Sequence, residues 1–167
     1  SFESAQSVAI QANGRIVVVG GSNDSIAVAR YNVDGSLDSS FDGDGRFVRR
    51  FNSNRSDTAW SVAIQANGRI VVAGGSWVSY AYNSSIRDFF VMRLNPGGSL
   101  DRTWDSDGYL NTSFTSGLVR TQEARDIAIQ TDGRIVVSGY AYINFSHNLA
   151  IARYNSDGSL DSSFDGD

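Results

Sequence analysis

Several residue types are missing or rare in this chain of 167 residues, and each absence excludes a kind of site. There is no cysteine and no lysine, and there is one histidine, His147. Disulfides, thiolate metal ligands and cysteine nucleophiles are therefore excluded. A serine triad would need His147, and no serine lies in a nucleophile-elbow motif. The only glutamates are Glu3 and Glu123, a poor basis for glycoside hydrolysis. We expect a non-catalytic protein, with a hydrolase as the least favoured function.

The charge and the apolar runs exclude two kinds of partner. The formal net charge is −4, and all 14 basic residues are arginines, of which only Arg49 and Arg50 are adjacent. A nucleic-acid interface needs clustered positive charge, so no nucleic-acid partner is expected. Apolar runs such as Ile16–Val19 are too short to cross a bilayer, so no membrane insertion is expected. A hydrophobic content of 41% predicts a packed, folded domain.

One stretch of fifteen residues occurs three times with small changes. "SVAIQANGRIVVVGG" begins at Ser7, "SVAIQANGRIVVAGG" at Ser61 and "DIAIQTDGRIVVSGY" at Asp126. The copies are 54 and 65 residues apart, which is too long for leucine-rich or β-helix coils. We divide the chain into repeats at 1–59, 60–124 and 125–167.

Each repeat predicts about four short antiparallel strands. In the first repeat, Val8–Gln11 and Arg15–Gly20 flank Asn13-Gly14, a dipeptide that favours a type I′ hairpin turn. A third strand is expected over Ile26–Tyr31 and a fourth near Arg46–Phe51. The third repeat stops before its fourth strand and is incomplete.

The strands are apolar on both faces, which indicates sheets that are covered on both sides. Sheets stacked face to face around a common axis form a β-propeller, so the predicted class is all-β and β-propeller-like. Three blades do not close a ring, because propellers carry about four to eight. We expect these repeats to belong to a larger or multi-chain propeller. A three-sheet prism and an open stack of sheets are the alternatives.

The segment "GRIVVVGGSNDSIAVARYNVDGSLDSSFDGDGRF" resembles the delta-60 repeat family, and related segments cover all three repeats. The resemblance implies propeller-like domains in large bacterial proteins that are secreted or attached to the cell surface. It implies no catalytic residues. The middle repeat departs from the pattern, because Gly97 replaces the aspartate of its turn and the loop after its second strand is longer.

Each repeat carries an Asp-x3-Asp-x-Asp pattern. Oxygen ligands grouped this closely suit Ca²⁺, which is the only cofactor that we consider. An EF-hand is excluded, because the required terminal glutamate is absent. Asp-Gly steps also form turns without any metal, so both interpretations remain open. The candidate ligands are Asp38, Asp42, Asp44, Asp101, Asp105, Asp107, Asp161, Asp165 and Asp167.

An arginine recurs in every third strand, as Arg30, Arg93 and Arg153. Each lies on the same face as large apolar residues, so it should be partly buried and need an anionic or carbonyl partner. One of the repeated aspartates is the expected partner, which makes these arginines structural. Binding of an anionic ligand is the alternative.

The repeats differ most in the loops between the second and third strands. In an up-and-down blade these loops lie at the same edge as the links between blades, and the Asn-Gly hairpins lie at the other edge. Variable loops on a rigid scaffold favour a binding face, although the rings could instead pack under their own loops. The candidate binding residues are Trp77, Tyr80, Tyr82, Tyr140, Tyr142, Phe145 and His147.

The predicted function is a structural or adhesion repeat module, located outside the cell or on the bacterial cell surface. Its expected partners are further repeats of the same or a longer chain, and a surface protein or polysaccharide. A carbohydrate-binding, lectin-like propeller is the alternative. Five Asn-x-Ser sequons permit glycosylation in a host that glycosylates, at Asn23, Asn54, Asn83, Asn111 and Asn144.

Overall fold

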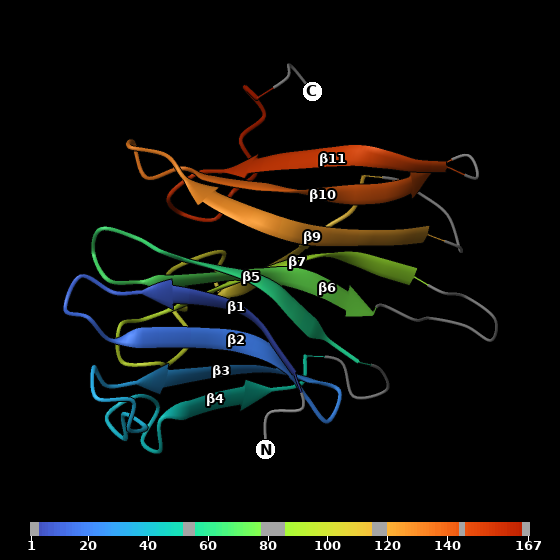
Figure 1. Cartoon of the computed structure of the whole chain (residues 1–167). Coiled ribbons are helices and arrows are strands. Elements are labelled where there is room, and N and C mark those ends of the chain that lie inside the picture. The colour runs from blue at the N-terminus through green and yellow to red at the C-terminus, as the bar shows by residue number, and fades with distance from the viewer. Residues whose placement is uncertain (1–3, 52–55, 78–85, 115–119, 144–145, 165–167) are drawn as a thin grey trace.

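A computed structural model describes residues 4–51, 56–77, 86–114, 120–143 and 146–164. Within these ranges the chain is all-β, with eleven strands in two sheets and no helix (Figure 1). A helix that is long and apolar enough to span a bilayer is accordingly not found in this part of the chain. The predicted all-β class is confirmed.

The first sheet is a four-stranded antiparallel meander, which we call the first blade. Its strands follow the chain order from one edge to the other. They are β1 (Ser4–Ile10), β2 (Ile16–Ser22), β3 (Ser25–Tyr31) and β4 (Arg46–Arg49).

The second sheet contains the other two repeats. The second blade repeats the meander with β5 (Thr58–Ile64), β6 (Ile70–Trp77), β7 (Ile86–Leu94) and β8 (Tyr109–Thr112). The third blade has β9 (Arg120–Ile129), β10 (Ile135–Ile143) and β11 (Ser146–Tyr154). A short parallel pairing of β7 with β9 joins the two blades into one sheet of seven strands, in which β8 pairs with β7 beside the main strand order. The sequence pattern, which predicts a sheet for each repeat, did not indicate this pairing.

The hairpin turns differ from the predicted type I′ geometry. In the first blade Gly14 has a φ of 81°, but Asn13 does not have a positive φ. The Gly14 N–H donates to the Gln11 carbonyl at 2.8 Å, and the Gln11 N–H donates to the Arg15 carbonyl at 2.8 Å. This is a three-residue loop that ends in a left-handed glycine, a geometry that also fits the twist of the strands. The type I′ prediction was wrong.

The hydrophobic core lies between the blades. One cluster joins the first blade to the second, and another joins the second to the third. Ile70, Val71, Val72 and Ala73 of β6 are fully buried, because the second blade is covered on both faces. Within the single chain the outer faces of the first and third blades are not covered, and Val8 is 62% exposed and Leu149 80% exposed there.

The first strand of each blade contains the same irregularity. The register of β5 against β6 shifts between Ala59 and Ser61, and β1 and β9 show an equivalent bulge. The bulge brings the Thr58 carbonyl against Gly74, where a Cβ would lie 1.9 Å from that oxygen. Glycine is required there because the two backbones approach so closely.

Replacing Gly74 by alanine should destabilise the fold by about 3 kcal/mol, because the bulge backbone has to move away from the added methyl group. Gly97→Ala is the matched control, since a Cβ at Gly97 meets nothing within 4 Å. Urea unfolding of both variants measures the difference. Equal stabilities would show that the bulge is not constrained at this carbonyl.

Candidate functional site

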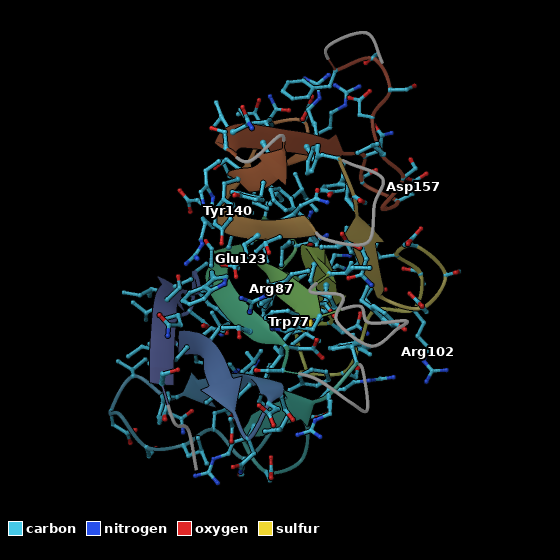
Figure 2. The ribbon with its side chains drawn as sticks, turned by 90° about the vertical axis from the view of Figure 1, so that its right-hand side faces the viewer. Trp77, Arg87, Arg102, Glu123, Tyr140 and Asp157 are labelled. Carbon is cyan, nitrogen blue, oxygen red and sulfur yellow. The ribbon has the colours of Figure 1, made fainter. Side chains whose placement is uncertain are left out.

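Aromatic rings and arginines gather at the edge of the blades where β6 and β10 end (Figure 2). Figure 2 shows Trp77, Arg87, Glu123 and Tyr140 next to one another along this edge. We call this group the aromatic–arginine cluster; its members are Trp60, Trp77, Arg87, Glu123, Arg125 and Tyr140.

A buried carboxylate lies at the centre of the cluster. Glu123 of β9 is only 2% exposed and forms ion pairs with Arg87 of β7 and Arg125 of β9. Arg87 also donates from Nη2 to the Thr58 hydroxyl at 3.2 Å, and its guanidinium lies 5.3 Å from the centre of the Trp77 ring. Burial lowers the pKa of Arg87, while the negative charge of Glu123 opposes this effect. The second and third blades are therefore joined by a desolvated ion pair.

Arg125 lies over two aromatic rings. Its guanidinium carbon lies 4.1 Å from the ring centre of Trp60 and 5.5 Å from that of Tyr140, distances at which cation–π attraction operates. Trp60 and Arg125 occupy the bulge positions of β5 and β9, and Gln6 has the same position in β1. The bulge position is thus occupied by a different residue type in each blade.

The remaining predicted binding residues extend the cluster in part. The ring of His147 lies 4.8 Å from the Tyr140 ring and 5.1 Å from the Tyr142 ring, between centroids, at the turn end of β10 and β11. Trp77 and Tyr140 belong to the cluster itself. Tyr80, Tyr82 and Phe145 lie outside the described residues.

Sequence reasoning missed Trp60, Arg87, Glu123 and Arg125. A signal for two of them was present, because the repeats read "SAQSVAI", "TAWSVAI" and "EARDIAI". The third residue of this otherwise similar stretch differs in every repeat, and it is the bulge residue, Gln6, Trp60 or Arg125. Arg87 and Glu123 carry no such repeat signal, and only the pairing of β7 with β9 brings them together.

The repeated arginines pair with aspartates eight residues later. The Nε–Oδ2 distances are 2.7 Å for Arg30 and Asp38, 2.8 Å for Arg93 and Asp101, and 2.8 Å for Arg153 and Asp161. The second carboxylate oxygen accepts from the hydroxyl and the N–H of the residue two positions on, which is Ser40, Thr103 or Ser163. Each arginine thereby fastens a strand to the turn that follows it.

The other described aspartates of the Asp-x3-Asp-x-Asp pattern serve in turns. Asp42 and Asp105 have left-handed backbones, with φ values of 49° and 47°. Burial raises the pKa of both, and the neighbouring Asp44 and Asp107 add to this effect. The Asp44 and Asp107 side chains accept from backbone N–H groups two residues on. Among the described residues, no three acidic or histidine side chains come close enough to share a metal ion. Asp165 and Asp167 lie outside them.

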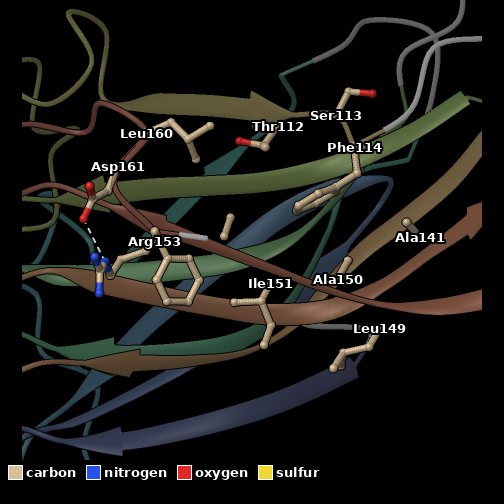
Figure 3. Close-up of a pocket in the computed structure, with 12 residues that line it drawn as sticks. Thr112, Ser113, Phe114, Ala141, Leu149, Ala150, Ile151, Arg153, Leu160 and Asp161 are labelled. Carbon is tan, nitrogen blue, oxygen red and sulfur yellow. Dashed lines mark hydrogen bonds and ion pairs between the residues drawn. The ribbon is translucent and has the colours of Figure 1, made fainter. Parts of the chain in front are cut away.

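A hollow of about 700 Å³ lies along β11 (Figure 3). It is lined mainly by apolar groups of β11, together with Thr112, Phe114 and Leu160. Its place corresponds to the positions where β4 pairs with β3 and β8 pairs with β7 in the other blades. The Arg153–Asp161 pair borders it, and no other charged group of the described chain lines it.

The stacked antiparallel meanders, two of four strands and one of three described strands, and their repeated Arg–Asp pairs define blades of a β-propeller. A family model described as a domain of unknown function (DUF5122) beta-propeller matches residues 11–41, 65–103 and 130–164. These segments cover more than half of the chain, so the chain belongs to this family. A search of the curated proteins found no match.

The acid stability of the third blade should depend on Ser163. The Ser163 hydroxyl, its N–H and Arg153 favour ionised Asp161, and together they lower the pKa of Asp161 from 3.8 to about 2. These contacts therefore stabilise the fold above about pH 4, and the contribution is lost as the pH falls towards 2. Ser163→Ala should raise the pKa of Asp161 towards 3.8, as measured by NMR titration of the carboxyl carbon. Ser162→Ala is the neighbouring control, and equal values in both variants would contradict this assignment.

Removing calcium should leave the stability unchanged, because no three acidic side chains of the described residues lie close enough to share an ion. Five aspartates of the pattern also accept hydrogen bonds within the chain already, namely Asp38, Asp44, Asp101, Asp107 and Asp161. We expect the same melting temperature in excess EDTA and in millimolar CaCl₂. A rise with calcium that is abolished in Asp42→Asn and Asp105→Asn would instead establish metal binding in these turns.

Proposed function

We propose that this domain is a non-catalytic structural or adhesion module that acts outside the cell or on the bacterial cell surface. The likeness of its repeats to delta-60 repeats supports this location. In this proposal the blades are the scaffold, and the aromatic–arginine cluster contacts a surface protein or polysaccharide. The observation that carries the proposal is the bulge, which has the same backbone in all three blades but presents Gln6, Trp60 and Arg125.

The chemistry of the cluster suits contact with a macromolecule. Trp60, Trp77 and Tyr140 are partly buried, so their rings are held in place before a partner arrives, and the side chain of Arg125 is 43% exposed. Tryptophan, tyrosine and arginine are the residues that contribute most binding energy at protein interfaces. Restrained side chains also lose less conformational entropy on binding.

The same contacts argue against a catalytic role. Glu123, the carboxylate of the cluster, is held by two guanidinium groups and is 2% exposed, so it is not available to attack or protonate a substrate. Asp38, Asp101 and Asp161 are held by arginines, and the Asp44 and Asp107 carboxylates accept from backbone N–H groups of their turns. A catalytic pair of carboxylates needs unequal environments around one pocket, and the hollow along β11 has only one carboxylate among the described residues that line it, Asp161.

A carbohydrate-binding module is the second candidate, favoured by the grouping of Trp60, Trp77 and Tyr140 at one edge. However, Arg125 lies over the rings of Trp60 and Tyr140, which are the surfaces on which a sugar would stack. A glycan would have to displace this guanidinium or use Trp77. We therefore favour a protein or an acidic polysaccharide as the partner.

Binding of the purified domain to a panel of extracellular matrix proteins and polysaccharides tests the proposal, with biolayer interferometry as the readout. We expect Trp60→Ala and Arg125→Ala to weaken the observed binding about tenfold or more. Arg102→Ala is a control that also removes an arginine, because Arg102 is exposed and lies away from the cluster (Figure 2). Binding that survives all the cluster variants would contradict the proposed site, and turnover of a glycan substrate would contradict the non-catalytic role.

A further inference from the structure

The outer faces of the first and third blades repeat the two sides of the interfaces inside the molecule. The side of each blade that meets the following blade contains the residue two positions before the repeated arginine. This residue is Val28 or Val91 in the first two blades, where it is fully buried, and Ile151 in the third blade, where it is 41% exposed. Figure 3 shows Leu149, Ile151 and Arg153 along β11 on this third blade.

The opposite side of each blade meets the preceding blade, and here it is the first blade that is exposed. Val62 of β5 is buried in the core shared with the first blade, and Ile127 of β9 packs against the core shared with the second. The equivalent residue of β1 is Val8, which is 62% exposed. The outer face of the first blade therefore corresponds to the side that meets a preceding blade. The outer face of the third blade corresponds to the side that meets a following blade.

Polar contacts across the internal interfaces follow one rule. Nη1 of Arg30 donates to the Pro96 carbonyl, and Nη1 of Arg93 donates to the Ser156 carbonyl at 2.8 Å. In both cases the acceptor is the second residue of an Asn-x-x-Gly turn in the following blade. Within the described chain no blade follows the third, so no Asn-x-x-Gly turn lies next to Arg153. The turn of the first blade has no blade before it, and Val33 is its second residue.

The turn glycines show that this position of the first blade is open. A Cβ on Gly98 would lie 2.7 Å from the Asp42 nitrogen, and a Cβ on Gly158 would lie 2.8 Å from the Asp105 nitrogen. The preceding blade therefore fills the space beside each of these turns. Gly35 is the equivalent residue of the first blade, and a Cβ there meets nothing within 4 Å.

From this repetition we infer that two copies of the chain dock head to tail, with the outer face of the third blade of one copy against the outer face of the first blade of the other. Arg153 of one copy donates to the Val33 carbonyl of the other, as Arg30 and Arg93 do to their acceptors within the chain. Ile151 and Leu149 cover Val8 and its neighbours. The inference is independent of the aromatic–arginine cluster and of its proposed partner.

Charge and symmetry agree with this pairing. Burial lowers the pKa of Arg93, and the negative charges of Asp101 and of Asp157, which is next to the acceptor Ser156, oppose this effect. Asp34 has the same position next to Val33. A head-to-tail contact joins two different surfaces, so it is repeated at each junction until the assembly closes. Two copies with three blades each would reach the range of about four to eight blades that closed propellers contain.

Sedimentation velocity over a range of protein concentrations tests the docking. We expect the unaltered chain to associate, and we expect both Val8→Asp and Ile151→Asp to remain monomeric, because each places a charge on one of the two apolar faces. An equimolar mixture of these two variants should associate again, since one undamaged junction remains possible between them. Asn111→Asp, which adds the same charge to the exposed part of β8 in the middle blade, should behave like the unaltered chain.

Gly35→Asn provides a steric test that leaves the isolated fold intact, because asparagine tolerates the left-handed backbone and a Cβ at this position meets nothing. This variant should lower the association constant at least tenfold. The inference is overturned if the unaltered chain is monomeric at every concentration. It is also overturned if only one of Val8→Asp and Ile151→Asp dissociates the assembly, because that result indicates a symmetric contact between identical faces.

Discussion

The guanidinium group at the end of each third strand is the constraint on which the blades depend. Arg30 and Arg93 are 3% and 4% exposed, and each binds the aspartate of its own turn and a backbone carbonyl of the following blade. A buried charge that loses its partner destabilises a protein by several kcal/mol. The strand, its turn and the next blade must therefore be in place together, which couples local turn geometry to the stacking of the sheets.

The aromatic ring four residues before the left-handed glycine completes this arrangement. Phe41 and Trp104 are fully buried and lie under the guanidinium groups of Arg30 and Arg93, at 4.7 Å and 5.5 Å from the ring centres. The residue after each ring donates its backbone N–H to the turn of the next blade. A single turn thus anchors its own arginine and forms part of the interface, and this explains why turn residues recur so regularly along the chain.

Scaffold and variable surface are separated by the bulge in the first strand of each blade. The backbone of the bulge is fixed by its close approach to Gly20, Gly74 and Gly139, whereas the bulge side chain is free to differ. In the second and third blades this freedom produces the contact between Trp60 and Arg125. A constrained backbone with an unconstrained side chain is a suitable basis for a binding surface, because changes there leave the core untouched.

The strands and the propeller class could be predicted from the repeats because periodicity and turn residues are local signals. The sequence indicated hairpins at the right places, but not their turn type, since only the glycine and not Asn13 adopts a positive φ. Nor did the sequence indicate which blade faces are covered within one chain, because the strands are apolar whether or not a blade lies next to them. The cluster was found only in part: Trp77 and Tyr140 lie in visibly variable segments, whereas Arg87 and Glu123 have no pattern around them.

The sequence by itself determined what depends on near neighbours in the chain. The eight-residue spacing of arginine and aspartate, the turn glycines and the alternation of the strands are all local, and they specify each blade. The tertiary structure decided what depends on contacts between distant segments. Glu123 meets Arg87 only because β9 lies beside β7, and Trp60 meets Arg125 only because β5 of the second blade packs against β9 of the third. The physical reason is that the position of one blade against another follows from packing across the core, which no single stretch of the chain contains.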